Sequence, residues 1–458
     1  MSDFAIERID TLDGFHRLKT DWDRLLAQSG FGTIFSSHNW LSVWWETLGE
    51  GHRPYILVAR RSDEIVGIAP LMLTGDKLEF MGTPNVDYAD FLIASPVEPV
   101  VRAFVDYLLE QRDQFGRIEL DQISDRSETL RCLQEIMPGL EVPYQLRPLE
   151  PTFSYVYDGP AGKQSEFKLK LKKLRNIRTY MNYYERAGGM KFRRIYDTEE
   201  ILRLLEPFYH LHLHRWDGTA TPSKFLDAEN MDFYRQLVRK FAPEDRICLT
   251  CLFHRNQPIA IYFSFHVNDT VYLYTSAYTQ FYYKRSPGTV ITYLQTEDYI
   301  QSGVREIDYI RGGEGYKSRF TNTEHQNYCL TVFESKSALR RQERWDRFKS
   351  TAVGTALRNN PKLMDLRIGL DLYARRHGKS GLLRYLASKV GRYLINIRRY
   401  DLFEVTIGGE TAPEPPHGMR FAELTIDDVD NLAILHGWWA NSEAYERARK
   451  RFERGERC

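Results

Sequence analysis

The sequence predicts a mixed α/β protein, of the α+β kind, built from two halves that repeat one order of helices followed by mostly antiparallel strands. The chain has 458 residues, which is more than a single hydrophobic core usually serves. Its composition, 42% hydrophobic and 27% charged, is typical of globular proteins. Apolar residues recur at helical spacing in some stretches and form short runs bounded by polar turns in others. We therefore expect two domains, residues 1–150 and residues 151–334.

The first half contains helical patterns and one hairpin. Two apolar runs flank the polar turn Ser62-Asp-Glu64, a pattern that predicts two antiparallel strands. The expected elements are helices at 14–30, 40–48 and 99–111 and strands at 55–61, 65–73 and 117–120.

The second half begins with a long basic helix that ends at Gly188-Gly189. Asn256-Gln and Asn268-Asp are turn signals, and they divide a later apolar region into three strands. The expected elements are helices at 165–187, 198–214 and 231–241 and strands at 190–195, 246–254, 258–267 and 270–277.

Beyond the two halves the chain becomes basic. Between Ser335 and Arg399 there are 17 Lys or Arg residues against four acidic ones, and apolar residues keep a helical spacing. Such a segment can bind an anionic membrane surface or a phosphate-bearing partner, or it can pack on the main body with a solvated basic face. We expect a basic helical extension at 335–407, a linker at 408–418, and an incomplete further domain at 419–458.

The cysteines and histidines do not indicate a metal site. Cys248 and Cys251 form a CxxC pair in a strand-like run, where residues three apart face opposite sides of a sheet. His210, His212 and His214 do not share one face of a helix. We expect no metal and no metal-ligating residues.

The chain carries no targeting signal that we recognise. The N-terminus is acidic and lacks an apolar core, and no apolar run reaches the roughly 20 residues of a membrane span. Five scattered cysteines argue against a disulfide framework and for a reducing compartment. We expect a cytoplasmic protein, with the inner face of the membrane as an option through residues 335–400, and the net charge of +1 gives no reason to expect DNA binding.

A candidate phosphate site lies at the start of a predicted helix. Ser286 suits the residue that caps the helix, Pro287 suits its first position, and Gly288 allows close approach of a backbone. A helix that begins this way offers free amide groups to a pyrophosphate, with Arg285 adding charge and Thr289 in the first turn. The same residues also make an ordinary helix start.

A second group of chemically capable residues follows the next strand. Asp308, Arg311, Glu314, Tyr316 and Lys317 lie within ten residues, around a glycine-rich loop. They provide acids, bases and anion-pairing groups. An ordinary glycine loop with an ion pair is the alternative.

The order of these motifs resembles a known family. Residues 286–320 resemble the second half of the acetyltransferases named for cellulose biosynthesis (CelD/BcsL), a group of the GNAT superfamily related to the FemAB peptidoglycan aminoacyltransferases. Further family-like stretches in the same order are Phe35–Trp40, Gly67–Leu71, Asp87–Phe91, Lys168–Arg178 and Leu211–Trp216. The resemblance covers roughly residues 5–335.

The resemblance implies two GNAT-like halves and transfer of an acyl group from acetyl-CoA or another acyl-CoA. The donor pyrophosphate would then lie on residues 285–289, which contain Gly288 but depart from the usual glycine-rich pattern. Such a transfer needs a base, for which Asp308 and Glu314 are the candidates, and an acid, for which Tyr316 is the candidate. The expected acceptor contacts are Asp87, Tyr88, Asp90, Arg215, Trp216, Arg311 and Lys317.

The expected function is acyl transfer to an amine or hydroxyl of a sugar, a polysaccharide precursor or a related envelope metabolite. Two alternatives remain open at this stage. One is a FemAB-like transferase that uses aminoacyl-tRNA, with the basic segment on RNA. The other is a GNAT-like binding or scaffold protein without catalysis.

Overall fold

The computed structural model describes residues 4–94, 96–159, 163, 174–216, 222–313 and 315–351. The described residues up to Arg215 and from Ser223 to Trp345 belong to one compact unit. The predicted segments beyond residue 351, including the linker at 408–418 and the segment at 419–458, lie outside the described residues. Within the described residues no helix is both long and apolar enough to cross a bilayer.

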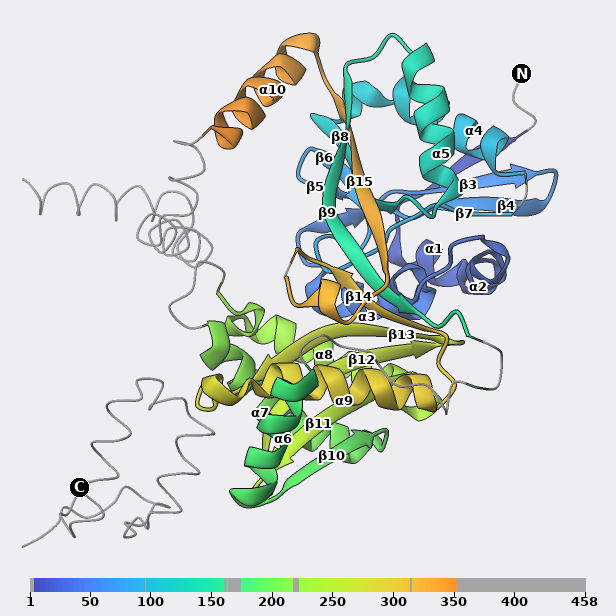
Figure 1. Ribbon diagram of the computed structural model, residues 1–458. Coiled ribbons are helices and arrows are strands. Elements are labelled where there is room, and N and C mark those ends of the chain that lie inside the picture. Colours follow the sequence, from blue (N-terminus) through green and yellow to red (C-terminus); the bar gives the residue numbers. More distant parts are fainter. Residues whose placement is uncertain are drawn as a thin grey trace, which may run out of the picture. The chain divides into compact units, whose positions relative to one another are not determined.

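Groups of helices and groups of strands follow one another along the chain (Figure 1). The strands are β1 (Ala5–Ile9), β2 (His52–Pro54), β3 (Ile56–Arg61), β4 (Glu64–Ala69), β5 (Leu71–Thr74), β6 (Lys77–Phe80), β7 (Leu92–Ile93), β8 (Arg117–Ser124), β9 (Tyr144–Val156), β10 (Met190–Ile195), β11 (Ile247–His254), β12 (Gln257–Val267), β13 (Thr270–Tyr278), β14 (Glu306–Arg311) and β15 (Thr323–Phe333). The α-helices are α1 (Leu12–Arg17), α2 (Lys19–Gln28), α3 (His38–Leu48), α4 (Val97–Glu110), α5 (Glu128–Ile136), α6 (Leu174–Arg186), α7 (Thr198–Trp216), α8 (Ala228–Phe241), α9 (Pro287–Gln301) and α10 (Lys336–Ser350).

Two sheets organise the described residues. The smaller one has the order β1-β3-β4-β7, and the larger one has the order β10-β11-β12-β13-β14-β9-β15-β8-β6-β5-β2. Most neighbours are antiparallel, whereas β13 and β14 are parallel, as are β6 and β8. The predicted fold class, mixed α/β with mostly antiparallel strands, is confirmed.

The three-stranded meander of the second half is confirmed almost to the residue. β11, β12 and β13 pair in sequence order, as the turn signals at Asn256 and Asn268 predicted. Both asparagines have a positive φ, 61° and 52°, which asparagine tolerates better than most residues. The turn signals in the sequence were therefore sufficient to predict these three strands.

The predicted strand at 65–73 is wrong in one respect, because Pro70 divides it. β4 pairs with β3 in the smaller sheet, whereas β5 pairs with β2 and β6 in the larger one. A proline cannot donate a ladder hydrogen bond, so it is a natural place for the chain to leave one sheet and enter the other.

Two strands that the sequence did not predict connect the larger sheet. β9 contains Pro148 and Pro151, residues that normally argue against a strand. β15 pairs with β9 on one side and with β8 on the other. The strands of the second half are thereby hydrogen-bonded to those of the first.

Helices cover both faces of the meander. One hydrophobic cluster joins α6 and α9 to the sheet, with Ile177, Val290 and Val271 among its members. The other joins α7 and α8 to the opposite face and includes Phe208 and Phe263. Figure 1 shows α9 lying along β11, β12 and β13, and these elements are in contact.

Candidate functional site

Strands β13 and β14 begin as a parallel pair and then diverge. Their register joins Thr270 to Glu306, Val271 to Ile307 and Tyr272 to Asp308, where the pairing ends. β13 continues along β12 to Tyr278, with a bulge opposite Phe263 and Ser264, while β14 stays with β9. In open sheets, ligands bind outside the carboxyl ends of parallel strands where neighbouring strands separate. Asp308 lies at the point of separation.

Helix α9 begins at the same end of β13. Ser286 has a left-handed backbone (φ 42°), and its carbonyl oxygen accepts from the amides of Thr289 and Val290 at 3.0 and 3.1 Å. The Ser286 hydroxyl bonds the Thr289 hydroxyl at 2.7 Å and caps no amide. The first helical residue is Pro287, as the sequence predicted. Pro287 has no N–H and Thr289 already bonds Ser286, so Gly288 carries the one amide of this first turn, among the described residues, for which the structure gives no partner; such an amide suits an anion.

Gly288 is required for packing in this first turn. A Cβ atom at this position would lie 2.8 Å from the ring of Tyr278, the last residue of β13. The guanidinium of Arg215 also lies over the Tyr278 ring, 4.1 Å from the ring centre. It donates to the Ser276 carbonyl at 3.3 Å. Arg285 lies 4.7 Å from the Tyr183 ring centre. Two arginines thus accompany the positive end of the α9 dipole.

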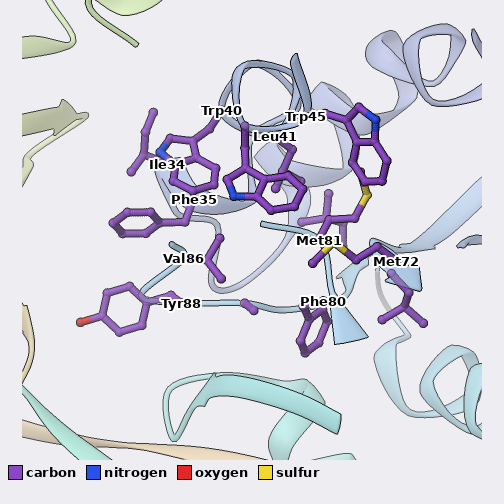
Figure 2. Packing of buried hydrophobic residues seen from close by; sticks show 14 of the residues in the cluster. Ile34, Phe35, Trp40, Leu41, Trp45, Met72, Phe80, Met81, Val86 and Tyr88 are labelled. Atoms are coloured by element: carbon purple, nitrogen blue, oxygen red, sulfur yellow. The ribbon is translucent and has the colours of Figure 1, made fainter. Parts of the chain in front are cut away.

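Tyr88 of the first half reaches Asp308 of the second. The Tyr88 hydroxyl donates to the two Asp308 carboxylate oxygens at 3.0 and 2.8 Å, and both residues are buried. Figure 2 shows the Tyr88 ring at the edge of the hydrophobic cluster around Phe35 and Val86, with its hydroxyl directed away from that cluster. Burial raises the pKa of Asp308 to about 7, although the hydrogen bond from Tyr88 acts to lower it.

An ion pair lies beside this contact. Arg311 Nε donates to Asp87 Oδ1 at 2.8 Å, and Arg311 Nη2 donates to the Pro84 carbonyl at 2.8 Å. Lys317 Nζ donates to the Arg311 carbonyl at 2.6 Å. Burial raises the pKa of Asp87, while the Arg311 charge opposes the shift. The structure thus brings five of the predicted residues into one neighbourhood: Asp87, Tyr88, Asp308, Arg311 and Lys317.

Lys224 joins this neighbourhood and was not predicted. It belongs to a short 3-10 turn, Lys224–Leu226, between α7 and α8. Its Nζ donates to the Tyr234 hydroxyl at 2.9 Å and to Thr275 Oγ1 at 3.4 Å, and it lies 5.0 Å from the Tyr274 ring centre. Burial lowers the pKa of Lys224 to about 8. No motif surrounds this lysine in the sequence, so only the fold reveals it.

Two residues with a left-handed backbone contact this neighbourhood, Ile310 beside Asp308 and Gln122 beside the loop that carries Asp87 and Tyr88. Ile310 has a φ of 52° and Gln122 a φ of 63°, values that are costly for side chains of these kinds. The Ile310 amide donates to Asp308 Oδ1 at 2.6 Å, and the Gln122 carbonyl accepts from the Ala89 amide at 3.0 Å. Backbone strain of this kind concentrates at functional sites.

The structure also describes Asp90, Tyr316 and Trp216 of the predicted residues. Asp90 is buried and accepts from the Phe91 amide at 2.8 Å, with Ser127 and Thr129 also bonding it; burial raises its pKa to about 6. Tyr316 packs against the cluster on the α9 face of the sheet. Trp216 is the last residue of α7, and Glu314 lies outside the described residues.

Two cavities occur elsewhere in the compact unit. The larger, about 820 Å³, is lined by residues that include Lys77, Arg117, Arg341 and Trp345. The smaller, about 440 Å³, is lined by residues that include Lys19 and Arg246. Neither contains a predicted site residue. Among the described residues no cluster of His, Cys, Asp or Glu could hold a metal ion.

Comparison with protein families matches part of the chain. Residues 172–318 match the family described as an acetyltransferase (GNAT) domain. This range contains α6 to α9, β10 to β14, and the predicted residues from Arg215 to Lys317. The match indicates a GNAT acyltransferase domain, for which acyl-CoA is the implied donor. No curated protein sequence matches the chain.

Solved structures show similar arrangements at low identity. FemX is 10% identical with a TM-score of 0.47, covering 73% of this chain and 99% of its own. L-PGS from Bacillus licheniformis is 12% identical with a TM-score of 0.42, covering 75% and 96%. A tandem GNAT protein from the clavulanic acid biosynthesis pathway is 9% identical with a TM-score of 0.42, covering 72% and 98%.

Proposed function

We propose that this protein transfers an acetyl or other acyl group from acyl-CoA to an amine or hydroxyl of a sugar, a polysaccharide precursor or a related envelope metabolite. The match of residues 172–318 to a GNAT domain supports acyl transfer. The observation that carries the proposal is the divergence of β13 and β14 beside the first turn of α9, within that range. The acceptor class rests on the family resemblance.

The donor would bind where α9 begins. A pyrophosphate would accept a hydrogen bond from the Gly288 amide in the first helical turn, and the dipole and Arg285 add favourable charge. The thioester would then lie between the separated ends of β13 and β14, close to Asp308.

The proposed chemistry divides between the two faces of the sheet. The acceptor attacks the thioester carbonyl, the C–S bond breaks, and a proton passes from the nucleophile to a base while the thiolate takes another from an acid. Asp308 is the proposed base, because a pKa raised by burial to about 7 suits proton uptake near neutral pH. Tyr316, on the α9 face, is the proposed acid for the thiolate. Glu314 is the other proposed base.

Calorimetric titration with acetyl-CoA and with CoA tests the donor site. A substitution at Gly288 would collide with Tyr278, so Thr289 is the better position. Thr289→Glu places a negative charge in the first turn, where it favours the helix but repels a pyrophosphate. Thr289→Gln is the matched neutral control. We expect Thr289→Glu to weaken CoA binding about tenfold or more and Thr289→Gln to change it little.

Either of two results would contradict the donor site. Wild-type protein that binds no CoA would remove acyl-CoA as the donor. Equal affinity of wild type and Thr289→Glu would place the pyrophosphate elsewhere.

We also propose that the basic segment 335–400 contacts an anionic membrane surface or a phosphate-bearing partner from the cytoplasmic side. Only its beginning is described. α10 carries Arg340, Arg341, Arg344 and Arg347, and Trp345 is 53% exposed. Sedimentation with vesicles of anionic and of neutral lipid tests the membrane option: equal binding to both would oppose it.

A further inference from the structure

Asn327 links three segments of the chain through one side chain. It lies in β15 and is fully buried. Its Nδ2 group donates to the Asp87 carbonyl at 2.9 Å and to Gln122 Oε1 at 2.9 Å. Asp87 belongs to the loop between β6 and β7, and Gln122 belongs to β8. Both N–H groups of this amide are therefore used to join the loop to the larger sheet.

Asn327 and Gln122 together hold the peptide groups on both sides of Tyr88. The Asp87 carbonyl belongs to the peptide bond that precedes Tyr88, and Asn327 bonds it. The Ala89 amide belongs to the peptide bond that follows Tyr88, and it donates to the Gln122 carbonyl at 3.0 Å. Because Asn327 also bonds the Gln122 side chain, the two holding residues are connected to each other. The backbone of Tyr88 is thus held on both sides.

Both holding residues lie where the strand pairing is irregular. The register of β15 with β9 shifts between Gln326 and Tyr328, on either side of Asn327. The register of β15 with β8 skips Gln122, whose backbone is left-handed (φ 63°). Irregular pairing of this kind changes the direction of a side chain, and it is common next to functional sites. Here it accompanies the two residues that bond the Tyr88 backbone.

The Tyr88 hydroxyl depends on this backbone for its position. A tyrosine ring is rigid and has two side-chain torsions, so the hydroxyl follows any movement of the backbone. The rings of Phe31, Phe35 and Tyr272 restrict these torsions, with centres 5.6, 6.1 and 6.5 Å from that of Tyr88. The hydroxyl lies 3.0 and 2.8 Å from the Asp308 carboxylate oxygens, so a displacement of about 1 Å would break both bonds.

We infer that Asn327 is a positioning residue, which holds the backbone of Tyr88 so that the Tyr88 hydroxyl stays bonded to the Asp308 carboxylate. Its significance rests on the proposed function, in which Asp308 is the base. The Tyr88 hydroxyl favours the charged form of this carboxylate, so the Asp308 pKa should rise when the contact is lost. Through Tyr88, Asn327 thus influences the pH range in which Asp308 can accept a proton.

Other titratable or charged groups also act on Asp308 or on Tyr88. They are Glu306, Arg126, Tyr272 and Asp87. Arg126 forms an ion pair with Glu306 at 2.8 Å, and Arg311 forms one with Asp87 at 2.8 Å. Among the described residues, none of these side chains bonds Asn327. Removal of the Tyr88 hydroxyl separates an effect that passes through Tyr88 from one that passes through these groups.

The test measures the Asp308 pKa directly, by NMR titration of the full chain with isotope-labelled aspartate carboxyl carbons. The Asp308 signal is assigned by its absence from Asp308→Asn. Asn327→Leu nearly keeps the shape of asparagine but has no donor. We expect it to raise the Asp308 pKa by about one pH unit, as Tyr88→Phe should. When Asn327→Leu is added to Tyr88→Phe, no further shift should follow.

Gln326→Leu is the matched control. Gln326 precedes Asn327 in β15, and its Nε2 also donates two hydrogen bonds, to the carbonyls of Leu149 and Asn327 at 2.8 Å each. The control therefore removes two amide hydrogen bonds from the same strand without removing a bond to the Tyr88 loop, and the Asp308 pKa should stay unchanged. If Asn327→Leu does not fold, Asn327→Ala, whose side chain is too small to clash, takes its place.

Three outcomes would overturn the inference: an unchanged Asp308 pKa in the Asn327 variant, an equal shift in Gln326→Leu, or a further shift when the Asn327 substitution is added to Tyr88→Phe. The titration does not require turnover. If the pKa shifts as expected but the protein transfers no acyl group from acyl-CoA, the proposed function fails and the positioning role stands. If the protein is active and the pKa does not shift, the positioning role fails and the proposed function stands.

Discussion

The start of α9 and the junction around Asp308 are built in opposite ways. The first uses consecutive residues, Arg285 to Thr289, and its chemistry comes from backbone amides and a helix dipole. The second joins Tyr88 to Asp308 across 220 positions of sequence, and its chemistry comes from buried charged side chains. A local site can be recognised from its sequence, whereas a long-range site appears only when the strands are in place.

The two regions also differ in what burial does. At the junction, burial raises the pKa of Asp308 and Asp87 and lowers that of Lys224. At the α9 start the binding groups are peptide amides, which do not titrate. We therefore expect changes at the junction to alter the pH dependence of the reaction and changes at α9 to alter donor affinity.

The largest effect should come from Asp308→Asn. If Asp308 is the base, turnover should fall about a hundredfold or more with little change in CoA affinity, because the amide cannot take up a proton. Steady-state release of CoA, together with calorimetry, measures both quantities. The residual rate should also lose its dependence on pH near 7. A small loss of turnover with an unchanged pH profile would leave Asp308 a purely structural role and make Glu314 the base.

Tyr88→Phe should shift the pH profile instead of abolishing turnover. The Tyr88 hydroxyl donates to the Asp308 carboxylate and so favours its charged form. Without this bond the pKa of Asp308 should rise further above about 7, and the acidic limb of the rate profile should move to higher pH by about one unit. A shift to lower pH, or none, would argue against the Tyr88 contact in solution.

The smallest of the three effects should come from Gly288→Ala. The new Cβ would lie 2.8 Å from the Tyr278 ring, so the ring or the helix start must move. We expect a loss of about 1–3 kcal/mol in the free energy of unfolding, measured by chemical denaturation. Gly30→Ala is the control, because nothing lies within 4 Å of its Cβ and its φ is not positive. Equal stability of the two variants would contradict the packing role of Gly288.

Many residues of the candidate site could be predicted from the sequence, but the contacts between them could not. Asp87, Tyr88, Asp308 and Arg311 were predicted as functional from their motifs, without any indication that Tyr88 bonds Asp308 or that Arg311 bonds Asp87. Lys224 escaped prediction because a lone lysine after a helix resembles many surface lysines. Its position depends on hydrogen bonds to Tyr234 and Thr275, which come from other elements.

The sequence by itself determined the elements whose signals are local. Turn asparagines defined β11 to β13, and Ser286 and Pro287 defined the start of α9. Only the tertiary structure decided that β9 is a strand despite its prolines and that Pro70 moves the chain between sheets. It also decided that Tyr88 meets Asp308 and that Asp87 meets Arg311. The physical reason is the distance along the sequence between the residues that interact. Turns and caps depend on a few adjacent residues, whereas strand pairing and the burial of charge depend on segments that meet only in the folded chain.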